Sequence, residues 1–419
     1  MHDQLQHPPA PPSAPSSGPD EGPQPRVIAA FLTIVAGTVL GLSGIDLVLP
    51  AVPQLPAIFG TNIENAQLVL ASYVAGMSVG LLMFGSLSAH FGRRRLFIAS
   101  LAAFGALSLM ATMTDNIHVL NIIRFFQGAA ASGGAVLAPG LIRALFSEIG
   151  AIRAVSAMGS IESLVPGLAP IAGAWLFKEY GWEASFSITG TLVLAICLIV
   201  FLIPSLLPHI GQKKGDTTSS YMRVMRNKTF LRYAVSHALI LGGLLVFVFS
   251  VPAVVIKTMD GVIEDFILMQ FVGVCLFIVS ANANGSLVKR FGNEAVISAG
   301  TDISLFGTLV LFGYALFGAN DPHHLAYMFW ILNLGHGIRS GPGFVRALAA
   351  THGDDDRASA LIILWTMMLA AAGTAIVAPF IEMGLAAVTF ALVLIVLPAP
   401  ILMRTLAPMG EDGRDTNPV

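Results

Sequence analysis

Long apolar runs, interrupted by short polar segments, fill the chain from residue 27 to residue 405. A helix needs about 20 apolar residues to cross the hydrocarbon core of a bilayer, whereas a barrel strand needs only about ten. Because the runs have the length of spanning helices, we predict an all-α membrane protein with twelve transmembrane helices. Their approximate limits are 27–49, 66–88, 95–114, 118–146, 154–177, 184–207, 230–256, 264–288, 294–318, 324–349, 357–380 and 384–405.

Positively charged residues distinguish the two sides of this predicted bundle. Of the 22 Lys and Arg residues, only Lys178 and Lys257 fall in loops on the side opposite the N-terminus. Arg124 and Arg339 fall inside predicted helices, and all the others lie on the side of the N-terminus. Loops that are rich in Lys and Arg face the cytoplasm. We therefore predict that both termini and the central loop are cytoplasmic.

The chain repeats itself across its centre. The segment Gly85-Ser-Leu-Ser-Ala-His-Phe-Gly92 matches Gly285-Ser-Leu-Val-Lys-Arg-Phe-Gly292, and Leu141-Ile-Arg-Ala-Leu145 resembles Phe344-Val-Arg-Ala-Leu348. Two matches in the same order predict two pseudo-symmetric six-helix halves, and parallel halves place a binding site between them near the membrane midplane. The predicted parts are a disordered Pro- and Ser-rich tail (1–26), the N-terminal half (27–207), the central loop (208–229), the C-terminal half (230–405) and a C-terminal tail (406–419).

Composition narrows the functions that such a bundle can serve. Hydrophobic residues make up 55% of the chain and charged residues 11%, against about 25% charged in ordinary globular proteins, so we expect the lipid bilayer to cover much of the surface. The net charge of −2 indicates no nucleic-acid partner, and Cys197 and Cys275 have neither disulfide nor metal spacing. The sequence holds no His-Glu-x-x-His, no phosphate-cradling motif and no Gly-x-Ser-x-Gly at a plausible site. We therefore expect no metal, no cofactor and no enzymatic activity.

Four motifs follow one another at the places where transporters carry signatures. They are Gly44-Ile-Asp-Leu-Val-Leu-Pro-Ala-Val-Pro-Gln-Leu55, the loop from Gly85 to Arg95, Arg124-Phe-Phe-Gln-Gly128, and Leu164-Val-Pro-Gly-Leu-Ala-Pro-Ile-Ala-Gly173. Together they resemble the major facilitator superfamily, and most closely its bicyclomycin-resistance branch of twelve-helix drug:proton antiporters. The resemblance implies a secondary active transporter of a bacterial inner membrane, functional as a monomer, that exchanges protons for small amphipathic compounds or drugs.

Two other functions remain open at this point. An exporter or facilitator of a native metabolite, such as a sugar or a siderophore, fits the same helix count, and only the resemblance of the fifth-helix motif favours drug export. A membrane-embedded enzyme is a more remote alternative, because it needs a paired nucleophile and base or a metal cluster. The loops are too short for the ligand-binding domain of a receptor.

Ionisable side chains inside a membrane are costly, so those in the predicted helices are functional candidates. Asp46, near the outer end of the first helix, is the predicted proton-coupling carboxylate. The resemblance makes Arg124 a second coupling residue that faces the cavity. Glu162 is the acid in the middle of the fifth helix, where it either binds a proton or a cationic substrate or simply pairs with Arg124.

Polar residues in the remaining spans are predicted to line the substrate cavity. They are Gln127, Asn282, His336 and Arg339, with His237 and Asp302 as further intramembrane candidates. His336 and Arg339 are three residues apart and should share a helix face. The structural alternatives are a hydrogen-bonded histidine for His336 and a helix–helix hydrogen bond for Asn282.

A conformational gate is the last predicted feature. Glycines permit a tight turn and close helix contact, and arginines hold the loop at the cytoplasmic face. Ala89 and His90 stand where the superfamily usually has an acid and an arginine. We therefore expect acids at residues 354–356 to pair with the arginines at 93–95 instead. The predicted gate residues are Gly85, Gly92, Arg93, Arg94, Pro166, Gly167, Pro170, Gly173 and Asp356.

Overall fold

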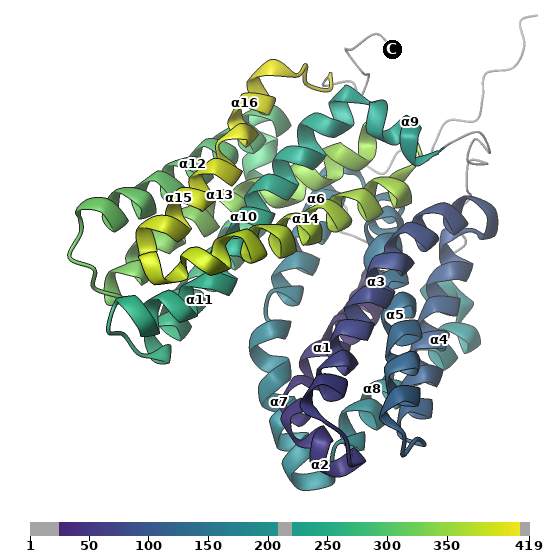
Figure 1. Ribbon diagram of the computed structural model, residues 1–419. Helices are drawn as coiled ribbons and strands as arrows, with labels where there is room; N and C mark the ends of the chain where they lie inside the picture. The colour runs from purple at the N-terminus through teal and green to yellow at the C-terminus, as the bar shows by residue number, and fades with distance from the viewer. Residues whose placement is uncertain (1–24, 208–219, 411–419) are drawn as a thin grey trace, which may run out of the picture.

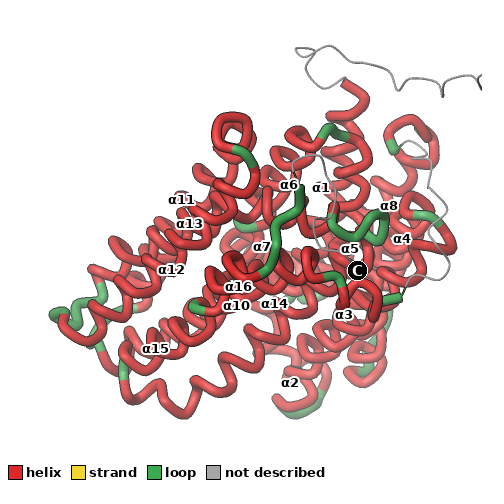
Figure 2. The backbone as a smooth tube through the Cα atoms, turned by 90° about the horizontal axis from the view of Figure 1, so that it is seen from above, coloured by secondary structure: helices red, strands yellow, loops and turns green. Residues whose placement is uncertain are grey.

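The computed structural model describes residues 25–207 and 220–410, and within these ranges every regular element is a helix (Figures 1 and 2). Most of the predicted N-terminal tail, half of the central loop and the end of the C-terminal tail lie outside the described residues. Eleven helical spans have the length and apolar composition to cross a membrane. The long helix α13 (His323–Ala349), which carries several charged and polar residues, supplies the twelfth. The predicted fold class is confirmed.

Six spans form the N-terminal half. The first ends in a short 3-10 helix, because Pro50 and Pro53 interrupt regular hydrogen bonding there. The fifth is broken at residues 163–164, just before Pro166. The elements are α1 (Pro25–Asp46), η1 (Leu49–Gln54), α2 (Leu55–Phe59), α3 (Ile63–Phe91), α4 (Arg93–Ala111), α5 (Ile117–Leu145), α6 (Glu148–Glu162), α7 (Val165–Tyr180), α8 (Glu183–Leu202) and η2 (Pro204–Leu206).

Six spans form the C-terminal half, and a short helix precedes them. This helix, α9, lies in the segment that the sequence assigns to the central loop. The last span breaks before Pro398. The elements are α9 (Tyr221–Arg226), α10 (Lys228–Thr258), α11 (Ile263–Phe291), α12 (Asn293–Phe317), α13, α14 (Asp355–Val377), η3 (Ala378–Met383), α15 (Leu385–Val396) and α16 (Pro398–Thr405).

The repeated Gly-Ser-Leu segments make equivalent turns in the two halves. Gly92 joins α3 to α4 with φ of 86°, and Gly292 joins α11 to α12 with φ of 79°. Positive φ of this kind is unfavourable for residues with a Cβ atom. The turn geometry therefore explains why both copies of the repeat end in glycine.

The two halves meet at one end of the molecule and separate toward the other. We call the end where α1 begins at Pro25 the near face, and the end where α1 finishes at Asp46 the far face. One hydrophobic core at the near face contains residues of both halves, including Leu141, Val345 and Ala360. At the far face each half has a core of its own. Figure 1 shows the helices of the two halves diverging in that direction.

The outer surface of the bundle is apolar. Large side chains such as Phe201, Phe271 and Phe317 are 76%, 66% and 88% exposed. A water-soluble protein rarely exposes contiguous apolar surface on this scale, whereas lipid covers it favourably. The chain is therefore a multi-pass membrane protein, as its composition predicts.

Candidate functional site

A buried arginine organises the far-face part of the N-terminal half. The Arg124 side chain on α5 is fully buried, and its Nε donates to Val69 O at 3.1 Å. Its Nη1 donates to Gly44 O at 3.0 Å and to Gln127 Oε1 at 2.7 Å. The guanidinium carbon lies 4.2 Å from the centroid of the Tyr73 ring. Neutral acceptors and an aromatic face thus hold this charge, and no carboxylate lies within salt-bridge distance in the described part of the chain.

Asp46 lies beside this cluster. It is the last residue of α1, two positions after the carbonyl that Arg124 contacts, and it is half-buried. It interacts electrostatically with Tyr73, whose hydroxyl donates to Gly41 O at 2.6 Å. Among the described residues Asp46 has no salt-bridge partner. Protonation of Asp46 therefore changes the net charge next to a fixed arginine and a fixed tyrosine.

Tyr73 and Ser108 complete the cluster without having been predicted. Gln127 Nε2 donates to Ser108 Oγ at 2.6 Å, and this bond orients the Gln127 carbonyl toward Arg124. Tyr73 is fully buried between α1, α3 and α5. Tyrosine is rare in this chain, with six residues in 419, and a tyrosine inside a spanning helix is a signal that the sequence does carry.

Glu162 occupies a different position from that cluster. It is the last residue of α6, and its side chain lies next to Thr38 of α1, whose hydroxyl donates to Val35 O. The alternative pairing of Glu162 with Arg124 is not found, because within the described residues Arg124 donates to the acceptors given above. The motif prolines and glycines follow the break after Glu162 and lie in α7. In α7, Gly173 lies against the α1 end, since a Cβ atom there would be 2.2 Å from Leu47 O.

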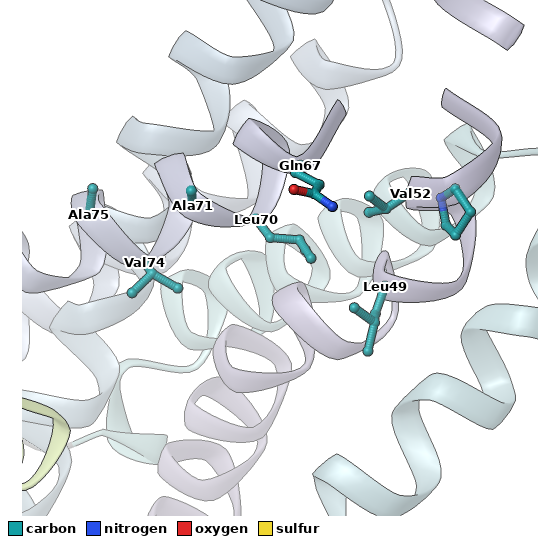
Figure 3. Close-up of a pocket in the computed structure, with 8 residues that line it drawn as sticks. Leu49, Val52, Gln67, Leu70, Ala71, Val74 and Ala75 are labelled. Carbon is teal, nitrogen blue, oxygen red and sulfur yellow. The ribbon is translucent and has the colours of Figure 1, made fainter. Parts of the chain in front are cut away.

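An apolar pocket of about 800 Å³ lies next to the end of α1. Figure 3 shows Val52 and Gln67 pointing toward each other, from η1 and α3. Gln67 is the only side chain of the lining with hydrogen-bonding groups, so the pocket suits an apolar ligand with few polar atoms. Its lining consists of Leu49, Val52, Pro53, Gln67, Leu70, Ala71, Val74 and Ala75.

Charged side chains close the near face. Arg93, at the start of α4, contacts Asp356 of α14 with Nε 2.8 Å from Oδ1, and contacts Asp355 at 3.3 Å. Asp356 also hydrogen-bonds Ser88, at the end of α3. This is a contact of the kind predicted between the two charge clusters, and it is made by Arg93. Arg94 instead donates to Leu207 O in its own half.

Two further ion pairs cross the near face in equivalent positions. Arg143 of α5 pairs with Asp355 of α14, and Arg346 of α13 pairs with Glu148 of α6 at 3.2 Å. Arg143 and Arg346 are the central residues of the second sequence repeat. The repeat therefore places one arginine of each half against an acid of the other half.

Tyr221 of α9 also reaches the N-terminal half. Its hydroxyl donates to Leu82 O at 2.6 Å, and a Cβ atom on Gly85 would lie 2.3 Å from the Tyr221 hydroxyl oxygen. Burial raises the pKa of Tyr221 to about 12, so the hydroxyl stays neutral and remains a donor. The sequence reading of this segment as a plain loop missed the contact.

The predicted cavity residues of the C-terminal half divide into two groups. Asn282 donates to Ser160 Oγ at 3.0 Å, which is a hydrogen bond between α11 and α6 across the two halves. His336 and Arg339 lie together deep in α13, as their spacing predicts, and His237 of α10 joins them. Asp302 lies apart from both, in a surface pair with Arg404 at 3.0 Å.

Comparison with known proteins gives consistent similarities. The family model of the Major Facilitator Superfamily matches residues 29–378. The bicyclomycin resistance protein homolog of Haemophilus influenzae is 24% identical over 303 residues, which are 71% of this chain and 74% of that protein. The chloramphenicol resistance protein of Pseudomonas aeruginosa is 25% identical over 297 residues, 70% of each chain.

Solved structures share the fold at lower identity. The transporter FucP in its outward conformation superposes with a TM-score of 0.69 at 15% identity, covering 90% of this chain and 99% of that one. A bacterial homologue of the iron transporter ferroportin, in an outward-facing state, gives a TM-score of 0.67 at 15% identity, covering 90% and 98%. At such identities the likeness concerns the fold alone.

Proposed function

This chain belongs to the Major Facilitator Superfamily, and we propose that it exports small amphipathic compounds in exchange for protons. The observation that carries the proposal is Asp46, a half-buried carboxylate without a salt-bridge partner among the described residues, beside the Arg124–Tyr73 cluster. A carboxylate in this setting can take up and release a proton while Arg124 keeps its charge. Relatives named for resistance to bicyclomycin and chloramphenicol support drug-type export.

The arrangement of the halves supports a defined orientation. Because Lys and Arg concentrate at the near face, we place that face and both termini in the cytoplasm, in a bacterial inner membrane. The sealed near face and the separate far-face cores then correspond to an outward-facing state. In this state Asp46 and the adjacent apolar pocket lie at the periplasmic end.

The driving force is sufficient for export without a nucleotide. One elementary charge that crosses 100 mV yields about 2.3 kcal/mol. Since about 1.4 kcal/mol corresponds to a tenfold ratio, this supports a gradient of roughly 50-fold. Protonation of Asp46 from outside and deprotonation inside would couple that energy to the rocking of the two halves.

Reconstituted protein with an imposed pH gradient tests the proposal. Cationic, neutral and anionic aromatic compounds are added to proteoliposomes, and proton release is recorded. We expect release that depends on substrate, reduced at least about tenfold in Asp46→Asn and partly restored in Asp46→Glu. The matched control is Asp115→Asn, which removes an exposed acid from the same face.

Each negative result has a distinct meaning. If folded protein exchanges labelled substrate but never moves protons, the chain is a facilitator rather than an antiporter. If proton release is unchanged in Asp46→Asn, antiport stands and the assignment of Asp46 is wrong.

A further inference from the structure

Two histidines and two phenylalanines form an aromatic cluster in the C-terminal half. The rings of His237 on α10 and His336 on α13 have centroids 5.8 Å apart, and each residue is 5% exposed. Phe277 of α11 stacks on His336 at 5.2 Å with 15° between the ring planes. Phe344 meets His237 edge-on at 5.6 Å. Three helices therefore contribute to one aromatic surface.

A buried positive charge lies beside this surface without an acid to balance it. Arg339 is fully buried, its Nη1 donates to Ser236 O at 2.6 Å, and its Nη2 donates to Ser236 Oγ at 2.8 Å. No carboxylate of the described chain lies within salt-bridge distance of Arg339. The acids Glu294 and Asp302 of the same half pair with Arg232 and Arg404 instead. Buried charges in proteins are normally paired, so Arg339 lacks the anion that would compensate it.

Among the residues that the structure describes, three buried nitrogens of the cluster also lack a hydrogen-bond partner. They are His237 Nδ1, His336 Nδ1 and Arg339 Nε. A buried polar atom without a partner is costly, and the large majority of buried side-chain polar atoms in native proteins have a hydrogen-bond partner. Several of them beside one uncompensated cation point to a ligand that brings oxygen acceptors and negative charge.

The cluster is not sealed, and it lies where the two halves meet. Phe277 and Phe344 are both half-buried. The tip of the Phe277 ring is 3.8 Å from the position of a Cβ atom on Gly159, which belongs to α6 of the other half. Glu162 lies one turn beyond Gly159 in the same helix. Glu162 of one half and the cluster around Arg339 of the other half thus border the same interface between the halves.

We propose that His237, His336 and Arg339 form a subsite for the carboxylate of an aromatic substrate. The ring of such a compound stacks on Phe277 and Phe344, and its carboxylate accepts hydrogen bonds from the imidazoles and the guanidinium. This inference rests on the proposed function and names its substrate class as aromatic carboxylates, including zwitterions whose amine faces Glu162.

Binding to the purified full-length protein in detergent tests the subsite without transport. The probes are 2-naphthoate, its uncharged amide and 2-naphthylmethylammonium, which share one ring system. We expect 2-naphthoate to bind about tenfold more tightly than the amide, the gain from one charge-assisted hydrogen bond. Arg339→Gln should remove this preference, and His336→Gln should reduce it. Arg404→Gln, which removes a surface cation of the same half, is the matched control.

Equal binding of naphthoate and amide by the wild type would overturn the subsite, as would a preference that survives in Arg339→Gln. If Arg339→Gln does not fold, a photoreactive aryl carboxylate on the wild type decides the matter. Crosslinks in α10 and α13 support the subsite, and crosslinks confined to the N-terminal half refute it. Because proton release with the naphthylmethylammonium probe is measured separately, loss of the carboxylate preference leaves proton antiport intact, and failed antiport leaves the binding result intact.

Discussion

The near and far faces of this molecule are built from the same twelve helices in opposite ways. At the near face one hydrophobic core runs through both halves, and Arg93, Arg143 and Arg346 each pair with an acid of the other half. At the far face each half keeps its own core, and polar groups such as Asp46 have no ion-pair partner within the described residues. Charged side chains thus hold the two halves together at the near face, whereas Asp46 at the far face is not engaged in an ion pair among the described residues.

The difference teaches how one bundle can alternate between two states. Salt bridges and short polar contacts can break and re-form, whereas the separate far-face cores hold each half rigid as a unit. We call the near-face contact between the two halves, held by the pairs of Arg93, Arg143 and Arg346, the seam. A transporter of this kind needs a seam that is strong enough to close and weak enough to open. The difference between the two faces can be tested by weakening the seam or by disturbing the far-face end of α1.

The largest effect is expected from the seam. Asp356→Asn leaves Arg93 without its closest acid in a mostly buried site, where breaking an ion pair costs about 3–5 kcal/mol. The near face should therefore open. In a Cys197→Ala, Cys275→Ala background, a cysteine at the buried position Ala360 should react with an impermeant maleimide at least about tenfold faster. The exposed pair Asp302–Arg404 provides the control, because such pairs contribute only about 0–1 kcal/mol. Equal labelling rates in Asp356→Asn and Asp302→Asn would refute the seam.

A smaller effect is expected where α7 meets the end of α1. In Gly173→Ala the new methyl group would lie 2.2 Å from Leu47 O, next to Asp46, so α7 must move. Overpacking of this kind costs about 1–3 kcal/mol. The matched control is Gly167→Ala in the same helix, which meets nothing within 4 Å. We expect Gly173→Ala to lower the Tm in detergent and to weaken proton-driven transport, and Gly167→Ala to leave the Tm unchanged. A Tm of Gly173→Ala at or above that of Gly167→Ala would contradict the close packing.

The smallest effect is expected in the far-face loop between α12 and α13. Hydrogen bonds from His323 hold the pKa of Asp321 below its ordinary value of 3.8. A carboxyl whose pKa is lower in the folded state stabilises the fold above its unfolded pKa and loses that contribution as the pH falls through the folded value. The wild type should therefore have a slightly higher Tm than Asp321→Asn at pH 6, and the difference should shrink as the pH falls below 3.8. A Tm difference that grows on acidification would reverse the sign of this linkage.

The sequence predicted the near-face contact but not all its members. The acids at 354–356 were paired with the arginines at 93–95 because Ala89 replaces the usual acid and an acidic cluster precedes the eleventh span. The structure shows that Arg93 and Asp356 make this contact. Tyr221 was missed, because a short helix in a polar segment has no long apolar run to mark it. The contact of the Tyr221 hydroxyl is with Leu82 O of the N-terminal half, and the sequence around Tyr221 gives no sign of that partner.

In the far-face cluster too, the sequence indicated some residues and only the structure showed their contacts. Asp46 and Arg124 are visible in the sequence because charge is rare inside spans, and Gln127 belongs to a recognisable motif. Their connection through Tyr73 and Ser108 is not visible, since both partners come from other helices. For the same reason the sequence left open whether Glu162 pairs with Arg124. Both lie in the same half, but among the described residues Arg124 contacts other acceptors and Glu162 lies next to Thr38.

The sequence by itself determined the twelve helices, the two-fold repeat and the membrane location, because apolar length and charge distribution along a chain decide whether a segment crosses lipid. The tertiary structure alone decided which end of the bundle is closed, which arginine meets which acid, and that His237 joins His336 and Arg339 around unpartnered nitrogens. Those features depend on distances of a few ångströms between side chains that lie about a hundred or more residues apart. Periodicity fixes which face of a helix is apolar, but only the packed bundle fixes what each polar atom meets.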